Sequence, residues 1–311
     1  MIFDFVQATK NASLNQSGRK FPNRDDSRCQ DGLLFPEFKP SFKLEPGAAI
    51  FTIGSCFARN IEEALLPLGF KLPTASFSVP KSEWPARPNG LLNEYNPGTI
   101  AQRIDAALTD KHFPDETIVA SGLLHADLML LGTAPDVSFE RIKERRQEIF
   151  KLYQNLPQCP YVVITLGFIE AWFDNQTQLF INRLPPNTLK DREPNRFVLK
   201  ILTVKDSLAL LEPAVDALCQ RGCKTILTVS PVPIKSTFSK SDCVTANEYS
   251  KAVLRVCAEE ICTNFNNVDY FPSFEIVRSG GLINYMPDNI HVKSEVVQKI
   301  TALMCQKYSE I

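Results

Sequence analysis

Short apolar runs alternate with amphipathic stretches along most of this chain. Four runs, bounded by glycine, serine or proline, predict buried β-strands at 48–53, 161–166, 224–229 and 268–271. Apolar positions three and four residues apart predict helices at 59–68, 138–156, 204–218, 246–264 and 292–308. The run 161–166 is apolar throughout, a pattern typical of a strand covered on both faces. We therefore predict a three-layer α/β/α fold with a mostly parallel sheet.

Two regions depart from this alternation. Residues 1–46 are polar, dense in Asn, Ser, Asp and Arg before three prolines, and predict an extended arm that wraps the domain with little regular structure. Residues 71–135 are rich in proline and predict a loop-rich insertion over the sheet edge, with a short helix at 98–108. Such insertions often shape substrate pockets. The main domain is then expected to span 47–311, insertion included.

Composition and charge exclude several classes of protein. Hydrophobic residues make up 44% of the 311, and 34 Lys and Arg nearly balance 35 Asp and Glu. The chain lacks the basic, aromatic-interleaved stripe of a nucleic-acid-binding protein. Its first residues lack the order of a signal peptide. The longest apolar run, 161–173, is too short for a membrane span and contains Glu170. We expect no nucleic-acid partner and no membrane span.

The cysteines and histidines bear on compartment and cofactors. Nine scattered cysteines, an odd number, suit reduced thiols in the cytoplasm better than a disulfide framework. There is no C-x-x-C pair, and three dispersed histidines offer no metal-ligand spacing. No glycine-rich phosphate loop is present. We therefore expect no metal and no cofactor.

The first candidate for chemistry is the serine at a strand-to-helix corner. Gly54-Ser55-Cys56 follows the strand 48–53 and opens the helix 59–68. Such a corner exposes a hydroxyl at the sheet edge and aims free main-chain N–H groups at it, as a nucleophilic serine requires. The alternative is that Ser55 is an N-cap, a role that serine often fills.

The second candidate is Asp288-Asn289-Ile290-His291, before the last predicted helix. An Asp and a His at this spacing can supply an orienting acid and a general base. The alternative is that Asp288 caps the helix beginning near Val292. Ligands of parallel α/β folds bind at the carboxyl ends of the strands. Gly54, Ser55, Gly167 and the 288–291 loop are expected to meet at that rim.

Taken together, these segments resemble the GSCFA family, named for a motif that stands here as Gly54-Ser55-Cys56-Phe57-Ala58. Further blocks resemble that family in order along the chain: 165–172, 227–233, 250–255, 270–275 and 288–291. The family is considered similar to the SGNH (GDSL-like) hydrolases, a flavodoxin-like α/β/α superfamily of esterases and acyltransferases. The resemblance implies Ser55 as nucleophile, His291 as base and Asp288 as its orienting acid. It also implies oxyanion donors from the Ser55 and Gly167 regions.

The chain departs from the superfamily at the oxyanion donors. Where the superfamily has an Asn two residues after Gly167, this chain has Ile169, followed by Glu170, which cannot donate when ionised. The counterpart of a second glycine lies near Asn89-Gly90. Asn96, or Asn93, is the candidate for the missing amide. Glu170 and Trp172 are candidates to line the pocket, and Glu170 has the alternative role of holding a loop by accepting main-chain N–H bonds.

Cys56 has two interpretations. A thiol at a helix N-terminus can be a reactive thiolate, and a small residue there can equally pack behind the corner. We prefer packing, since Ser55 and Cys56 cannot both face one carbonyl.

The sequence thus predicts a serine esterase or O-acyltransferase acting through an acyl-enzyme on Ser55. Its expected substrate is a small-molecule or carbohydrate acyl compound. The alternative is a non-catalytic ligand- or protein-binding module with a degenerate triad. The sequence leaves the oligomeric state open.

Overall fold

A computed structural model describes residues 2–308 of the chain. Its helices are α1 (Phe5–Leu14), α2 (Cys56–Leu65), α3 (Pro97–Thr109), α4 (Phe139–Tyr153), α5 (Asn187–Arg192), α6 (Val204–Cys219), α7 (Cys243–Asn264), α8 (Ser273–Ser279) and α9 (Ser294–Tyr308). Its strands are β1 (Cys29–Gln30), β2 (Leu33–Leu34), β3 (Ile50–Gly54), β4 (Ile118–Ser121), β5 (Leu124–Asp127), β6 (Tyr161–Leu166), β7 (Glu170–Asp174), β8 (Leu179–Ile181), β9 (Phe197–Ile201), β10 (Lys224–Val229) and β11 (Val268–Tyr270).

The central sheet is parallel and has the strand order β11-β10-β6-β3. A single parallel bridge between Ala49 and Lys71 extends it beyond β3, where the Ile50 N–H donates to the Lys71 carbonyl at 2.9 Å. The strands end together, at Gly54, Leu166, Val229 and Tyr270. Their carboxyl ends therefore form one rim, as the sequence predicted.

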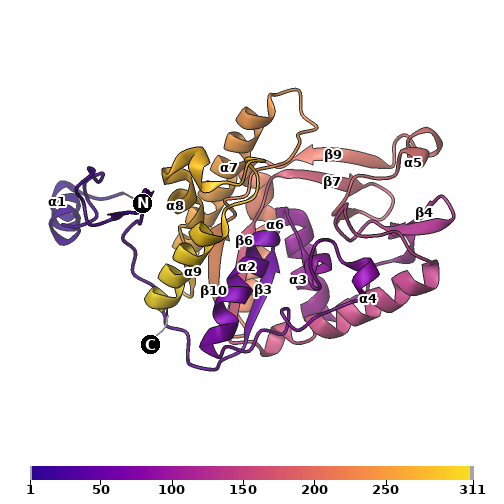
Figure 1. Ribbon diagram of the computed structural model, residues 1–311, viewed down its shortest axis with the longest axis horizontal. Coiled ribbons are helices and arrows are strands. Elements are labelled where there is room, and N and C mark those ends of the chain that lie inside the picture. Colours follow the sequence, from indigo (N-terminus) through magenta and orange to yellow (C-terminus); the bar gives the residue numbers. More distant parts are fainter. Residues whose placement is uncertain (1, 309–311) are drawn as a thin grey trace.

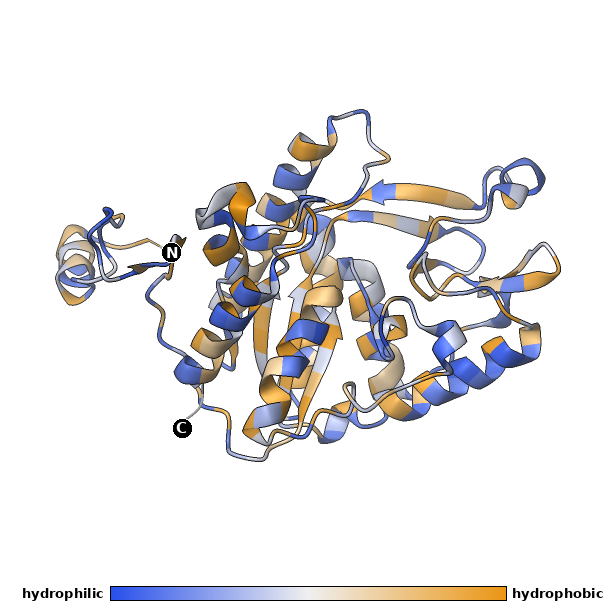
Figure 2. Ribbon diagram, viewed as in Figure 1, coloured by the Kyte–Doolittle hydropathy of each residue, from blue (hydrophilic) through white to orange (hydrophobic). Residues whose placement is uncertain are grey.

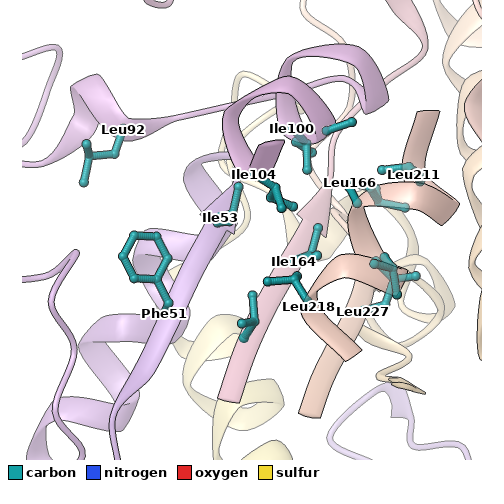
Figure 3. Packing of buried hydrophobic residues seen from close by; sticks show 14 of the residues in the cluster. Phe51, Ile53, Leu92, Ile100, Ile104, Ile164, Leu166, Leu211, Leu218 and Leu227 are labelled. Carbon is teal, nitrogen blue, oxygen red and sulfur yellow. The ribbon is translucent and has the colours of Figure 1, made fainter. Parts of the chain in front are cut away.

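Helices cover both faces of this sheet (Figure 1). On β6, Tyr161 and Val163 pack into a core with α2, α8 and α9, whereas Val162 and Ile164 pack into a core with α3, α4, α6 and α7. Figure 3 shows Ile164 and its neighbours on β3 and β10 facing α3 and α6. Successive side chains of a strand point to opposite faces, so an apolar run fills two cores at once. The three-layer α/β/α prediction is confirmed.

A second, antiparallel sheet projects from the carboxyl end of β6. Its order is β8-β7-β9, and three residues separate the end of β6 from the start of β7 (Figure 1). Residues 71–135 run as loops and short turns around α3 and the β4–β5 hairpin. Figure 2 shows apolar colour on the central strands and polar colour on much of α4. Within the insertion, the 93–96 segment reaches the rim, where Asn93 forms a parallel bridge with Gly54 at the end of β3.

The N-terminal arm differs from the prediction. We expected little regular structure, but α1 and the β1–β2 hairpin form there. Helix α1 stands away from the domain (Figure 1), whereas β2 contacts α8, where the Leu34 N–H donates to Ser279 Oγ at 2.8 Å. No residue of Phe5–Leu14 is buried. Later in the arm, Asp31 pairs with Lys299 of α9 at 2.8 Å, and Leu33, Phe42 and Leu44 are buried in the domain core. Asp4 caps α1 by accepting the Gln7 N–H at 2.7 Å, a local stabilisation that the polar composition concealed. No helix within residues 2–308 combines the length and apolar character needed to cross a bilayer.

Candidate functional site

The corner between β3 and α2 is fixed by close packing of two strands. Gly54 has φ of 130°, and a Cβ there would lie 2.2 Å from the Thr165 carbonyl oxygen on β6. Both the backbone angle and this approach require glycine. Gly54 therefore lets β3 press against β6 and turns the chain sharply into α2.

Ser55 is the N-cap of α2 and is 2% exposed. Its Oγ accepts the Phe57 N–H at 3.3 Å and lies 3.2 Å from the Thr165 Oγ1. Its N–H donates to that same Thr165 hydroxyl at 2.8 Å. The capping interpretation is therefore correct, and it does not exclude the nucleophile. Sequence reasoning gave Thr165 no role, although it lies in the 165–172 block.

One main-chain donor is left at this helix N-terminus. The Cys56 N–H, the first of α2, has no hydrogen-bond partner among residues 2–308. Free N–H groups at a helix N-terminus stabilise negative charge. The Cys56 N–H can therefore serve an oxyanion that forms at Ser55.

Asp288 and His291 form a preassembled pair. Asp288 Oδ2 lies 2.5 Å from His291 Nδ1, and Asp288 Oδ1 accepts the main-chain N–H groups of Ile290 and His291 at 2.9 and 3.0 Å. The hydrogen bond from His291, followed by the two main-chain donors, lowers the pKa of Asp288 to about 2. Asp288 thus holds a turn and does not cap a helix at Val292, since α9 begins at Ser294.

This pair is not hydrogen-bonded to Ser55. Among residues 2–308, the His291 ring bonds to Asp288 alone, and its side chain is 69% exposed. The loop that carries it is nevertheless anchored at the rim, because Tyr285 donates its hydroxyl to the Pro231 carbonyl, just after β10, at 3.1 Å. The structure brings Asp288 and His291 together and leaves Ser55 separate from them, at the same end of the sheet.

The Gly167 prediction needs correction. The Gly167 and Phe168 N–H groups both donate to the Tyr95 carbonyl, at 2.9 and 3.0 Å, and the Ile169 N–H donates to Ser250 Oγ at 3.0 Å. A Cβ at Gly167 would lie 2.6 Å from the Tyr95 oxygen. The main-chain donors of this loop are therefore used within the protein and are not available to an oxyanion. Gly167 is needed for the close approach of the 93–96 segment.

The candidates for the amide donor, Asn96, Asn93 and Gly90, differ in whether they have an N–H group available to bind an oxyanion. The Asn96 amide oxygen caps α3 by accepting the Thr99 N–H at 3.0 Å, while its amide nitrogen has no partner among the described residues. Asn93 donates weakly to the Tyr95 hydroxyl at 3.5 Å. Gly90 lies in a short turn where a Cβ would be 2.6 Å from the Pro85 carbonyl, which gives it a packing role. Asn96 is the stronger candidate for the amide donor.

A cavity of about 310 Å³ opens beside these loops. Its lining combines aromatic, aliphatic, polar and charged residues: Tyr95, Asn96, Gly132, Phe168, Glu170, Trp172, Ile181, Asn182, Arg183, Leu184, Ile234, Lys235, Ser236 and Phe238. Two ring pairs form its walls. Tyr95 stacks on Phe168 with centroids 5.3 Å apart, and Trp172 meets Phe238 edge-on at 5.3 Å.

Glu170 fills both roles considered for it. It lines the cavity, and it also accepts hydrogen bonds from the Thr237 hydroxyl and from the Phe238 N–H, the latter at 2.8 Å. Its carboxylate therefore holds the loop after β10 against the cavity. Trp172, on the same strand, lines the cavity as well.

The electrostatics of the corner weigh against a reactive Cys56. Burial raises the pKa of the Cys56 thiol, although Arg87 and Lys251 act in the opposite direction. A reactive thiolate needs a lowered pKa.

Lys251 itself is a buried amine that sequence reasoning named only as part of the 250–255 block, without a role. Within residues 2–308, no three His, Cys, Asp or Glu side chains gather as a metal site would require.

Comparison with known proteins identifies a family for this chain, but it does not identify an activity. The family model described as "GSCFA family" matches residues 49–303, which include the Ser55 corner, the cavity and the Asp288–His291 pair. No curated protein matches the chain.

Proposed function

The chain belongs to the GSCFA family, and we propose that it is a serine esterase or O-acyltransferase of the SGNH type. The observation that carries the proposal is the Asp288–His291 pair, preassembled at the same end of the sheet as a serine on a helix N-terminus. A carboxylate that orients an imidazole near a serine is the arrangement that recurs in acyl-transfer enzymes.

In the proposed reaction, Ser55 Oγ attacks the carbonyl carbon of an ester while His291 Nε2 accepts the hydroxyl proton. The tetrahedral intermediate then expels the alcohol, which takes that proton from His291, and leaves an acyl-enzyme on Ser55. Water or an acceptor alcohol completes the cycle. Asp288 stays ionised at neutral pH because its pKa is about 2, and it holds the proton on Nδ1, which leaves the Nε2 lone pair for the serine.

The oxyanion would form between two donors. One is the Cys56 N–H at the start of α2, and the other is the amide nitrogen of Asn96. Removing one such donor from a working enzyme costs on the order of a hundredfold or more in rate. The proposed donors replace the Asn that the superfamily carries where this chain has Ile169.

Catalysis requires the two halves of the site to meet. The proposal is that substrate at the rim draws the exposed His291 ring to Ser55 Oγ, in place of the Thr165 contact. The cavity would hold the acyl group or its carrier, a small-molecule or carbohydrate compound. Buried free thiols such as Cys159, Cys223 and Cys257 support the further proposal that the protein works in the cytoplasm.

A fluorophosphonate probe, which reacts with activated serine hydroxyls, tests the proposal directly. We expect the wild type to be labelled at Ser55, Ser55→Ala to be unlabelled and inactive on acetyl esters, and Ser76→Ala, which removes a hydroxyl from another loop, to behave as wild type. Full esterase activity in Ser55→Ala would overturn it.

A second candidate is a non-catalytic binding module with a degenerate triad. The observation that favours it is the engagement of the Ser55 hydroxyl with Thr165 while His291 faces solvent. In that case the folded wild type would not be labelled. A ligand found by thermal-shift screening would then lose binding in Trp172→Ala and keep it in Ser55→Ala.

A further inference from the structure

Lys251 is a buried amine that ties together the two loops at the rim. It lies on α7, is 1% exposed, and donates from Nζ to the Gly167 carbonyl at 2.6 Å and to the Val232 carbonyl at 2.8 Å. Gly167 follows β6 and Val232 follows β10. A single side chain thus joins the loops that follow adjacent strands.

The neighbouring Ser250 holds the same loop from its other end. Its Oγ accepts the Ile169 N–H at 3.0 Å, while Gly167 and Phe168 donate to the Tyr95 carbonyl. The residue before Tyr95, Glu94, donates its N–H to the Gly54 carbonyl at 2.8 Å. A continuous set of contacts therefore runs from α7 through the loop after β6 to the Ser55 corner.

The charge of Lys251 acts on that corner. Two carbonyls occupy two of the three hydrogens of its ammonium group, and the third has no partner among residues 2–308. Lys251 interacts electrostatically with the Cys56 thiol and, more weakly, with Glu248. Arg87 and Tyr95 also interact electrostatically with Cys56. Burial lowers the pKa of Lys251 to about 7.

We propose that Lys251 is a positioning residue of the Ser55 site, which joins the two rim loops and in its ammonium form adds the positive field that stabilises the oxyanion. The inference rests on the proposed function. A cation in a desolvated site acts on a nearby developing anion far more strongly than it would in water. When Lys251 loses its proton, the carbonyl contacts can persist, but the positive field and the third donor are lost.

This arrangement predicts that His291 and Lys251 must be in opposite charge states during the reaction. His291 must be neutral to accept the serine proton, whereas Lys251 must be charged to support the oxyanion. The reaction of Ser55 should therefore fall as pH rises through about 7, where Lys251 titrates. Arginine stays charged across this range, so Lys251→Arg should lack the alkaline decline.

The first measurement is the rate of fluorophosphonate labelling of Ser55 from pH 5.5 to 9. We expect an alkaline decline in the wild type and in Lys240→Met, an exposed lysine on the loop after β10. We expect no such decline in Lys251→Arg, and labelling slower by about tenfold at pH 6 in Lys251→Met. A Lys251→Arg profile identical to wild type would overturn the inference, and it decides the matter if Lys251→Met does not fold.

The second measurement does not depend on catalysis. Iodoacetamide alkylation of Cys56, followed by mass spectrometry of its peptide, reports the cation near the corner. At pH 6 we expect alkylation several-fold slower in Lys251→Met than in wild type, because the thiolate loses a stabilising charge. Equal rates would overturn the inference. A wild type with no labelling of Ser55 would instead overturn the proposed function, and the positioning role of Lys251 in that reaction with it.

Discussion

The Ser55 corner and the Asp288–His291 loop are built by different means, although both are proposed to serve one reaction. Ser55 is almost fully buried, and its hydroxyl and N–H contact Thr165 on the neighbouring strand, 110 residues away in sequence. His291 is largely exposed, and its partner Asp288 is three residues away. Sheet packing therefore places the proposed nucleophile, whereas local chain geometry assembles the proposed base. The corner should be sensitive to any change in packing, and the loop should tolerate substitution without unfolding the domain.

The largest expected difference between an effect on rate and an effect on stability comes from His291→Ala. We expect the esterase rate to fall by at least about a thousandfold, because the proposed general base is lost. The free energy of unfolding should change by no more than about 0.5 kcal/mol, because the side chain is exposed. Urea unfolding and ester hydrolysis measure the two quantities.

The matched control is His112→Ala, which removes another histidine, stacked on Phe150 away from the rim. Its rate should stay at the wild-type level. A large loss of stability in His291→Ala would show that the loop is not independent of the domain core.

Gly54→Ala should disturb the corner through both a steric clash and backbone strain. A Cβ at 2.2 Å from the Thr165 carbonyl, added to a φ of 130°, should reduce the free energy of unfolding by about 3 kcal/mol or more. Gly132→Ala is the control, because the nearest atom to its new Cβ is 3.8 Å away and its φ is not in the left-handed region. Similar urea midpoints for the two variants would contradict the account of the corner.

Thr165→Val removes the hydroxyl that joins β6 to Ser55. The Ser55 N–H would lose its shorter hydrogen bond inside the protein, and we expect a loss of about 1–2 kcal/mol in unfolding free energy. Thr245→Val is the comparison, since its hydroxyl bonds to Asp242 at an exposed site. An equal loss of unfolding free energy in both variants would mean that the Thr165 hydroxyl stabilises the fold no more than an exposed threonine hydroxyl does.

The smallest expected effect is on the pH dependence of the free energy of unfolding under acidic conditions. The folded pKa of Asp288 lies at about 2, below its ordinary 3.8, so its contribution to stability is complete above about pH 4 and is lost as pH falls through 2. Asp288→Asn should remove that part of the acid dependence and lower the rate at neutral pH, because the amide cannot hold His291 in the same way. Urea unfolding from pH 5 to 2 measures it, and an unchanged acid slope would count against the pair.

The strands of the central sheet could be predicted closely, whereas the elements around the site could not. The predicted strands 161–166 and 224–229 coincide with β6 and β10, because a strand buried on both faces leaves a local apolar run. For residues 174–200 the sequence favours an irregular excursion or a hairpin, and it leaves the register of the antiparallel β8-β7-β9 sheet open. The capped helix α1 was missed, since a short exposed helix leaves no such run. The Gly167 prediction failed because Tyr95, from a distant loop, took its N–H.

The sequence by itself determined the three-layer fold, the serine at a strand-to-helix corner and the Asp288–His291 pair, because each depends on residues close together in the chain. Only the tertiary structure decided that Thr165 contacts Ser55, that Tyr95 occupies the donors of the Gly167 loop, and that Lys251 joins two rim loops. Most of these contacts link segments about 70 to 110 residues apart. Their partners follow from strand order and close packing, which no local pattern of residues specifies.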